Sequence, residues 1–231
     1  MVPAETGRVR RFSNFRITEH FLLIILFSFL AATGLCQKFY FLGASRFVIG
    51  ALGGIDNVRL LHHIAGVCFT ALLLGHVLSS FLGVLMLRWE PSMLITFKDV
   101  HDAVADIRYY LAIGERPAPH PSGPHGKFGY REKFIYWLTL LGGLQMAATG
   151  FTLWFPVTVA KFMPGQFIPA AKDIHSSDAM LLLLIVVVWH IYDSALSPEV
   201  FPLNKSIFTG FKDTCEIRDI HGFIDRGEKD C

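Results

Sequence analysis

Clustered cysteines are missing from this sequence. It has four cysteines in 231 residues, and none of them forms a CxxC or CxxCH motif. A c-type haem is attached through CxxCH, and an iron–sulfur cluster needs several cysteine thiolates close together. Neither group is therefore expected to be held wholly by this chain.

Charged residues are also scarce. They make up 17% of the sequence, against 52% hydrophobic residues that include 21 phenylalanines, and the mean hydropathy is +0.45. This is too apolar for an ordinary soluble domain. Four segments reach the length of about 20 residues that crosses a hydrocarbon core, namely 17–41, 60–87, 134–156 and 174–196. The sequence predicts an all-α membrane protein, a bundle of four transmembrane helices.

Lysine and arginine are distributed unevenly between the predicted loops. Sixteen of the 21 lie before the first span, between the second and third spans, or after the fourth. Cytoplasmic segments carry such an excess, so both termini are predicted to be cytoplasmic. The N-terminal arginines lead into a full-length span, which is unlike a cleaved signal peptide. We assign the transmembrane domain to residues 1–200 and a cytoplasmic tail to residues 201–231.

These features indicate a multi-pass protein of a bacterial or archaeal cytoplasmic membrane, with membrane lipid around its spans. The net charge of +2 gives no reason to expect nucleic acid as a partner. Between the second and third spans, residues 91–115 carry an amphipathic pattern, with Val100, Val104 and Ile107 on one face and aspartates on the other. This pattern predicts a helix that lies along the cytoplasmic surface of the membrane.

Histidines lie inside the apolar segments, where an imidazole is costly. His62 and His76 are fourteen residues apart in the second span, and His175 and His190 are fifteen apart in the fourth. At 1.5 Å and 100° per residue, the members of each pair are about 21–22 Å apart and within roughly 40–60° of one helix face. Two matched pairs at two depths predict two haems stacked across the membrane, each iron held by histidines from facing helices.

Depth predicts which histidines face one another. Counted from the nearest outer-face cation, His62 and His175 each lie about 4–5 Å deep, which assigns them to an outer haem. His76 and His190 lie about 25–27 Å deep, and so does His20 in the first span. The inner haem therefore takes His190 and either His20 or His76. Spacing alone favours His76, because one pair of helices would then hold both haems.

The residues around these histidines have predicted places as well. His63 faces away from the His62 side of its helix and is interpreted as an interfacial histidine. Haem propionates need cations, and Arg59 is placed for the outer haem, with Arg16, Arg131 or Lys133 for the inner one. Each cation also fits the role of an interfacial anchor, and a single membrane histidine is more often a packing residue than a ligand. The full set, matched in depth on three helices, favours haem.

Together these residues give the chain a family resemblance. It resembles the cytochrome b (gamma) subunits of membrane formate dehydrogenases, and more closely the cytochrome b/b6-domain proteins that accompany multihaem cytochromes c or iron–sulfur subunits. The likeness covers about residues 10–210 and is specific in combination. The matching segments are Arg16–Phe21, Thr33–Leu35, Arg59–His62, Gly129–Trp137, Thr149–Pro156, Ile174–His175, Trp189–Tyr192 and Pro198–Pro202.

The resemblance implies two haem b groups (iron protoporphyrin IX) and their ligands. The outer haem would be held by His62 and His175, and the inner haem by His20 and His190. This disagrees with the spacing argument for His76, which the formate dehydrogenase pattern lacks. We follow the family for His20 and keep His76 as an alternative inner ligand, a quinone-site residue or a proton carrier.

The resemblance also implies a quinone site beside the inner haem, for menaquinone or ubiquinone. The matching stretch here contains Gly129, Arg131 and Glu132, although the family has Asn and Gly at the first two of these positions. Glu132 is a sensible proton carrier, because quinone reduction takes up two protons with two electrons. A carboxylate paired with a neighbouring cation fits equally well. Asp178, between the two histidines of the fourth span, is a candidate hydrogen-bond partner of a ligand imidazole.

The predicted function is that of an electron-transfer, quinone-reactive subunit of an oxidoreductase complex in a respiratory chain. No residue of this chain is assigned as catalytic, and it has no site for a primary substrate. Electrons would pass between the quinone pool and an extracytoplasmic iron–sulfur or multihaem cytochrome c subunit, with a catalytic oxidoreductase subunit as a further possible partner. The alternatives are a histidine-based metal or proton transporter and a stand-alone transmembrane reductase of the ferric type.

Overall fold

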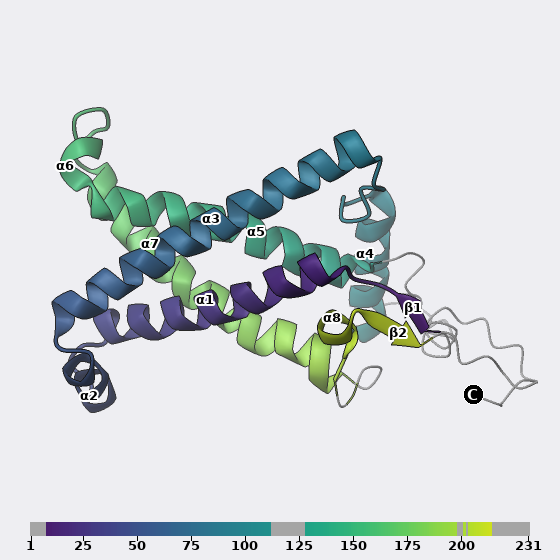
Figure 1. The fold of residues 1–231 in the computed structure, drawn as a ribbon, viewed down its shortest axis with the longest axis horizontal. Helices are drawn as coiled ribbons and strands as arrows, with labels where there is room; N and C mark the ends of the chain where they lie inside the picture. Colours follow the sequence, from purple (N-terminus) through teal and green to yellow (C-terminus); the bar gives the residue numbers. More distant parts are fainter. Residues whose placement is uncertain (1–7, 112–127, 198–200, 202, 214–231) are drawn as a thin grey trace, which may run out of the picture. The chain divides into compact units, whose positions relative to one another are not determined.

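The computed structural model describes residues 8–111, 128–197, 201 and 203–213. Four helices are long and apolar enough to cross a membrane (Figure 1). They are α1 (Asn14–Lys38), α3 (Ile55–Leu87), α5 (Tyr130–Trp154) and a fourth, Phe167–Leu196, which begins as α7 (Phe167–Ile185). The prediction of an all-α protein with four apolar spans is therefore confirmed, with small shifts at the helix ends.

Apolar side chains on these helices point outwards. Ile25, Phe81, Leu141 and Leu184, one from each long helix, are all more than half exposed. A soluble protein rarely leaves so large an apolar surface uncovered, whereas lipid solvates it at no cost. The arrangement is that of helices surrounded by lipid.

The remaining elements are short. They are β1 (Arg8–Arg10), α2 (Gly43–Ala51), α4 (Phe97–Tyr110), α6 (Pro156–Val159), α8 (Ser206–Thr209) and β2 (Phe211–Asp213). The chain forms two compact units, which we call the histidine unit (residues 18–83 and 138–203) and the loop unit (residues 1–17, 84–137 and 204–231).

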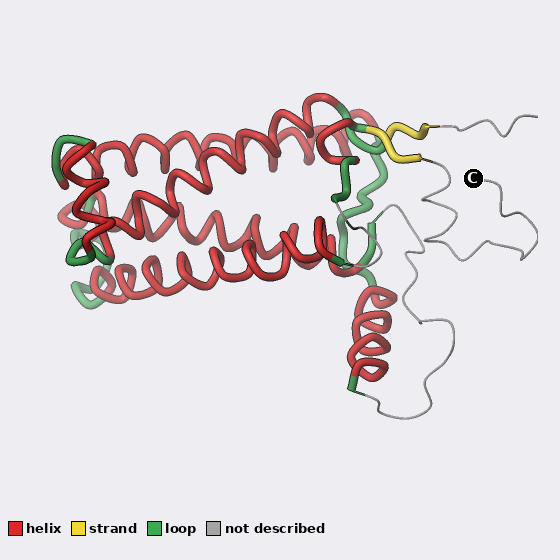
Figure 2. The backbone as a smooth tube through the Cα atoms, turned by 90° about the horizontal axis from the view of Figure 1, so that it is seen from below, coloured by secondary structure: helices red, strands yellow, loops and turns green. Residues whose placement is uncertain are grey.

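The histidine unit contains most of the four long helices, which run alongside one another (Figure 2). Small residues on α5 allow close approach of its neighbours. A Cβ atom on Gly143 would lie 2.7 Å from Leu73 Cδ1 of α3, and one on Gly142 would lie 2.9 Å from Leu182 Cδ2 of α7. Glycine at helix contacts is common in membranes, where van der Waals packing drives helix association.

The fourth long helix is not a regular α-helix throughout. After α7 it continues as two π-helical turns, Val186–His190 and Tyr192–Leu196. A π-turn bonds i to i+5 and so accommodates one extra residue without breaking the helix, and such turns are frequent at functional sites. The first π-turn ends on His190, one of the predicted ligands.

In the loop unit, the N-terminal residues and the residues after the fourth span form a small antiparallel sheet that the sequence did not predict. Arg8 pairs with Asp213 and Arg10 with Phe211. The backbone amides of Arg11 and Phe12 then donate to the carbonyl of Gly210. Gly210 has φ +84°, and a Cβ there would lie 3.1 Å from the Phe12 carbonyl oxygen, so the turn into β2 requires glycine.

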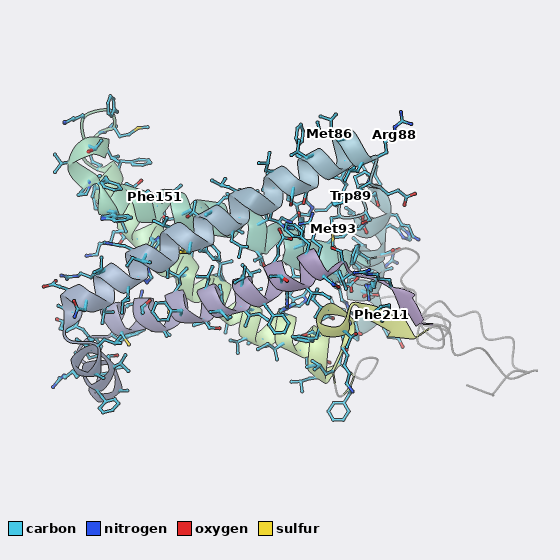
Figure 3. The ribbon with its side chains drawn as sticks, in the orientation of Figure 1. Met86, Arg88, Trp89, Met93, Phe151 and Phe211 are labelled. Atoms are coloured by element: carbon cyan, nitrogen blue, oxygen red, sulfur yellow. The ribbon has the colours of Figure 1, made fainter. Side chains whose placement is uncertain are left out.

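Helix α3 ends in a loop built on polar contacts within the loop unit. Arg88, just after the last residue of α3, adopts a left-handed conformation with φ +52° and stops the helix. Figure 3 labels it with Trp89 and Met93 from the same loop. The indole of Trp137 in α5 donates to the Met93 carbonyl oxygen at 2.9 Å, which ties the loop to α5.

Helix α4 begins six residues into the amphipathic stretch predicted over residues 91–115, of which 112–115 lie outside the described residues. Its polarity is inverted relative to a soluble surface helix. Asp99 and Asp106 are buried, whereas Val100, Val104 and Ile107 are about half exposed or more. Asp99 accepts hydrogen bonds from the backbone amide and hydroxyl of Thr96, at 2.7 Å each. The acidic face of α4 thus packs on protein and its apolar face is uncovered.

Candidate functional site

Two long helices bring His62 and His175 face to face in the histidine unit. His62 comes from α3 and His175 from α7, and their ring centroids are 6.4 Å apart with planes at 78°. These are the two residues that depth had predicted to form the outer pair.

Each of the two imidazole rings is contacted by one threonine hydroxyl, and the two threonines come from the other two long helices. Thr33 Oγ1 of α1 lies 2.8 Å from His62 Nδ1, and Thr149 Oγ1 of α5 lies 2.9 Å from His175 Nδ1. Each threonine hydroxyl also lies within hydrogen-bond distance of a carbonyl of its own helix. For Thr33, the hydroxyl donates to the Phe29 carbonyl at 2.8 Å. All four long helices therefore contribute to the surroundings of this pair.

A glycine follows each of these threonines and lets the imidazole lie against the helix backbone. A Cβ atom at Gly34 would lie 3.4 Å from His62 Cε1, and one at Gly150 would lie 3.3 Å from His175 Cε1. A larger side chain at either position would press on the ring from the side. The Thr-Gly dipeptide thus recurs on α1 and α5 with the same contact.

His20 and His190 form a second pair in the histidine unit. His20 comes from α1 and His190 from the π-turn of the fourth helix, with ring centroids 6.3 Å apart and planes at 62°. Fifteen residues, about 22 Å of helix, separate His175 from His190, so the two pairs occupy two levels of the same unit.

The spacing within each pair fits a metal ion bound between two imidazoles. Twice the sum of a metal–nitrogen bond of about 2.0 Å and an imidazole radius of about 1.1 Å gives roughly 6.2 Å between ring centroids. The observed values are 6.3 and 6.4 Å. Two nearly equal separations of this size would suit these four histidines as the residues that hold haem iron. Their role as haem ligands stays a prediction.

His76 does not occupy the position that helical spacing favoured. Its Nδ1 lies 3.2 Å from Oε2 of Glu19, and both side chains are largely buried. Glu19 precedes His20 on α1, so α1 presents a carboxylate to His76 and an imidazole to His190. Of the two alternatives for the partner of His190, the structure brings His20 into place.

His63 stacks on an aromatic side chain. Its ring centroid lies 4.4 Å from that of Trp154 with planes at 21°, and Phe151 and Phe155 also stack with Trp154. This agrees with the expectation that His63 faces away from its neighbour His62.

The arginines predicted for haem propionates have nearby protein partners. Arg59 donates to Asp56 at 3.0 Å on the exposed first turns of α3. In the loop unit, the Arg16 guanidinium lies 5.6 Å from the ring centroid of Phe15 and 5.9 Å from that of Trp89. These contacts are typical of cations at a membrane interface, and a propionate role stays a prediction.

The residues predicted for a quinone site lie at the start of α5, inside a network of charges in the loop unit. One carboxylate oxygen of Glu132 accepts a hydrogen bond from the Arg11 guanidinium at 2.9 Å, and the other accepts one from the Gly129 backbone amide at 3.0 Å. Arg131 donates to the buried carboxylate of Asp106 at 3.0 Å, and Tyr130 donates to the same oxygen. Glu132 thus caps the helix N-terminus, where a negative charge is stabilising.

A second buried pair completes this network. Lys133 donates to Asp99 at 2.8 Å, with both side chains about nine-tenths buried. Burial raises the pKa of Asp99, but the hydrogen bonds from Lys133 and Thr96 outweigh it and hold that pKa below its usual range. Lys133 therefore forms an ion pair with α4.

Three contacts were missed by reading the sequence, namely those of Thr33, Thr149 and Glu19. The Thr-Gly dipeptide was visible as part of the family resemblance, but a hydroxyl contact to a residue 29 or 26 positions away has no local signal. The carboxylate of Asp178, a candidate partner of a ligand imidazole, accepts a hydrogen bond from the Gln145 amide of α5 at 2.5 Å. Its role beside an imidazole stays a prediction.

Four helices of membrane-spanning length, with histidine rings facing one another at two levels, define a class of protein: the integral membrane cytochromes of the b type. The model of the prokaryotic cytochrome b561 family matches residues 79–210, more than half of the chain. The chain belongs to this family, which makes it a membrane b-type cytochrome of electron transfer. Among curated proteins, none matches it. The narrower resemblance to formate dehydrogenase subunits stays a prediction.

Proposed function

We propose that this protein carries electrons across a membrane between an extracytoplasmic redox partner and quinone, through two bis-histidine haems b. The observation that carries the proposal is that two pairs of histidine rings face one another. The ring centroids are 6.4 Å apart in the His62–His175 pair and 6.3 Å apart in the His20–His190 pair, and the two pairs lie at different levels along the fourth helix.

The residues of this chain hold and orient the groups that react. Haem, when bound, supplies one-electron exchange between ferric and ferrous iron. His62 and His175 would hold the outer group, and His20 and His190 the inner one. All four histidines are partly buried between the helices, and burial is one of the factors that sets a haem potential.

The orientation of the chain is proposed from its charges. The excess of lysine and arginine before α1, between α3 and α5, and after the fourth helix supports a cytoplasmic location for both termini. The uncovered apolar face of α4, with Val100, Val104 and Ile107, suits a helix lying in the membrane interface. The His62–His175 pair is then the outer one, facing an iron–sulfur or multihaem cytochrome c subunit.

The quinone site is proposed at the start of α5, around Gly129, Arg131 and Glu132, on the cytoplasmic side. There the two electrons that a quinone accepts would be matched by two protons from the cytoplasm. The ion pairs of Arg131 and Glu132 supply hydrogen-bonding groups, but a bound quinone would have to share or displace their partners. Menaquinone and ubiquinone both fit this chemistry.

The test is the haem content and the redox partner of the purified full-length protein. A pyridine haemochrome spectrum should give two haems b per chain, and a quinol analogue added to proteoliposomes should reduce them. A colourless protein would favour a histidine-based transporter and overturn the proposal. Three haems per chain would mean that His76 is also a ligand. Reduction by cytoplasmic reductants without quinol, with transfer to ferric chelates, would favour the stand-alone reductase.

A further inference from the structure

We infer that Thr33 and Thr149 are positioning residues that fix the tautomer of His62 and His175 and lower the reduction potential of the haem these histidines hold. The inference rests on the proposed function, since it needs a haem between the two rings. It concerns two hydroxyls to which no role has yet been given.

The direction of the hydrogen bonds follows from counting protons. A threonine hydroxyl has one proton to donate and lone pairs to accept with. Thr33 Oγ1 lies 2.8 Å from the Phe29 carbonyl and 3.2 Å from that of Leu30, and these oxygens can only accept. The hydroxyl proton thus has acceptors on its own helix, which leaves the oxygen lone pairs able to accept from the imidazole.

Thr149 shows the same arrangement. Its Oγ1 donates to the carbonyl oxygens of Gln145 at 2.8 Å and Met146 at 3.2 Å. In both cases the hydroxyl oxygen can accept from the imidazole. With Nε2 as the nitrogen that would bind iron, Nδ1 of His62 and Nδ1 of His175 each carry the proton, and for His175 the Met146 carbonyl is a further acceptor. The lone pair of each neutral ring then lies on Nε2, the atom available to a metal.

The two contacts repeat one design. In each half of the histidine unit, the first long helix (α1 or α5) supplies a Thr-Gly dipeptide and the second (α3 or α7) supplies the histidine. The hydroxyl holds Nδ1 while the glycine allows Cε1 of the ring to approach the helix, at 3.4 Å from a Cβ built on Gly34 and 3.3 Å from one built on Gly150. Two independent contacts of this geometry fix the ring rotation as well as the tautomer.

The electronic consequence follows from the bond itself. A ligand imidazole that donates its second N–H to an oxygen becomes a stronger base toward the metal. A stronger base favours ferric over ferrous iron, because the ferric ion carries more positive charge. Both threonines should therefore hold the potential of the His62–His175 haem below the value it would have with bare imidazoles.

The experiment compares valine and serine variants of the full-length protein, purified with haem. Valine keeps the shape of threonine but has no hydroxyl, whereas serine keeps the hydroxyl. The matched control is Thr152→Val on α5, whose hydroxyl donates to the Ala148 carbonyl at 2.9 Å, one turn from Thr149. The readouts are haem content and the two midpoint potentials from an optical redox titration, measured without any electron-transfer assay.

We expect Thr33→Val and Thr149→Val each to raise one of the two midpoint potentials. The expected change is about threefold in the ratio of ferrous to ferric haem at fixed potential, about 30 mV for a one-electron couple. The double variant should roughly double this shift, while Thr33→Ser, Thr149→Ser and Thr152→Val leave both potentials unchanged.

Failure of this inference is separable from failure of the proposed function. If wild type contains no haem, the proposed function fails first. If the valine variants retain two haems with both potentials unchanged, the role of the hydroxyls is wrong while the cytochrome assignment stands. Should a valine variant lose haem, loss in the matching serine variant as well would overturn the inference, and retention there would support it, because the hydroxyl alone distinguishes the two.

Discussion

Nδ1 of His76 lies 3.2 Å from the carboxylate of Glu19, the residue that precedes His20 on α1. This contact separates two histidines of similar depth, of which helical spacing alone favoured His76 as the partner of His190. The His76 ring contacts a carboxylate of α1, whereas the His20 ring faces the ring of His190. The two residues should therefore respond differently to substitution.

We expect His76→Ala to retain both haems and His20→Ala to lose one of them. The alanine at 76 removes the partner of Glu19 but leaves both ring pairs intact, while the alanine at 20 removes one side of the His20–His190 pair. Haem-to-protein ratios from pyridine haemochrome spectra distinguish these outcomes. Loss of a haem from the His76 variant, with none lost from the His20 variant, would reverse our choice of ligand.

Adjacent histidines on α3 offer a sharper comparison. His62 faces His175, and His63 stacks on Trp154. His62→Ala should reduce the haem content from two to one, whereas His63→Ala should keep two haems and only weaken the aromatic stack, by about 1 kcal/mol of stability. Equal haem contents in the two variants would contradict the assignment.

The π-turn before His190 predicts an unusual tolerance to deletion. Fifteen α-helical residues rotate by about 60° relative to a whole number of turns, and fourteen by about −40°. Since a π-turn absorbs one residue, deleting Val187 should make the helix regular up to His190 and still present His190 to His20. Both haems should be retained.

An insertion at the same place is the control. One alanine after Val187 rotates His190 by about 100° away from His20, and we expect one haem to be lost. The same spectra measure both variants, with membrane insertion checked by their yield in the membrane fraction. A deletion variant as depleted of haem as the insertion variant would show that the π-turn has another role.

The buried pair Lys133–Asp99 should be stabilising only as a pair. Lys133→Met leaves the Asp99 carboxylate buried without its cation, which we expect to cost about 3 kcal/mol. The double variant Lys133→Met, Asp99→Asn removes the uncompensated charge and should recover most of this loss. Thermal unfolding in detergent measures both, and equal stability of the single and double variants would contradict the expected coupling.

The same carboxylate predicts a dependence on acid. The pKa of Asp99 is raised by burial but lowered on balance by the hydrogen bonds from Lys133 and Thr96. A carboxyl whose pKa is depressed by folding contributes its full stability above its unfolded pKa of about 3.9 and loses it as the pH falls through the lower, folded value. The unfolding temperature should fall more steeply below about pH 4 in wild type than in Asp99→Asn.

Several features of this protein follow from its sequence alone. Long apolar segments with few charges can only be membrane helices, so the four spans and the all-α fold were predictable from composition. Helical periodicity predicted that His62 and His76 share one face of their helix at two depths, and that His175 and His190 do the same, because rise and rotation per residue are fixed. The sequence thus determined which histidines could act and at what depths.

Only the tertiary structure decided which side chains meet. Periodicity fixes rotation within a helix but not between helices, so it favoured His76 where the structure brings His20 to His190. It also did not predict the π-turn that ends on His190. The contacts of Thr33 and Thr149 depend on how α1 and α5 pack on their neighbours. The acidic face of α4 was predicted as its polar side, yet it is buried, because Lys133 and Arg131 supply the opposite charges there. Pairings across helices come from packing, and packing is a property of the whole fold.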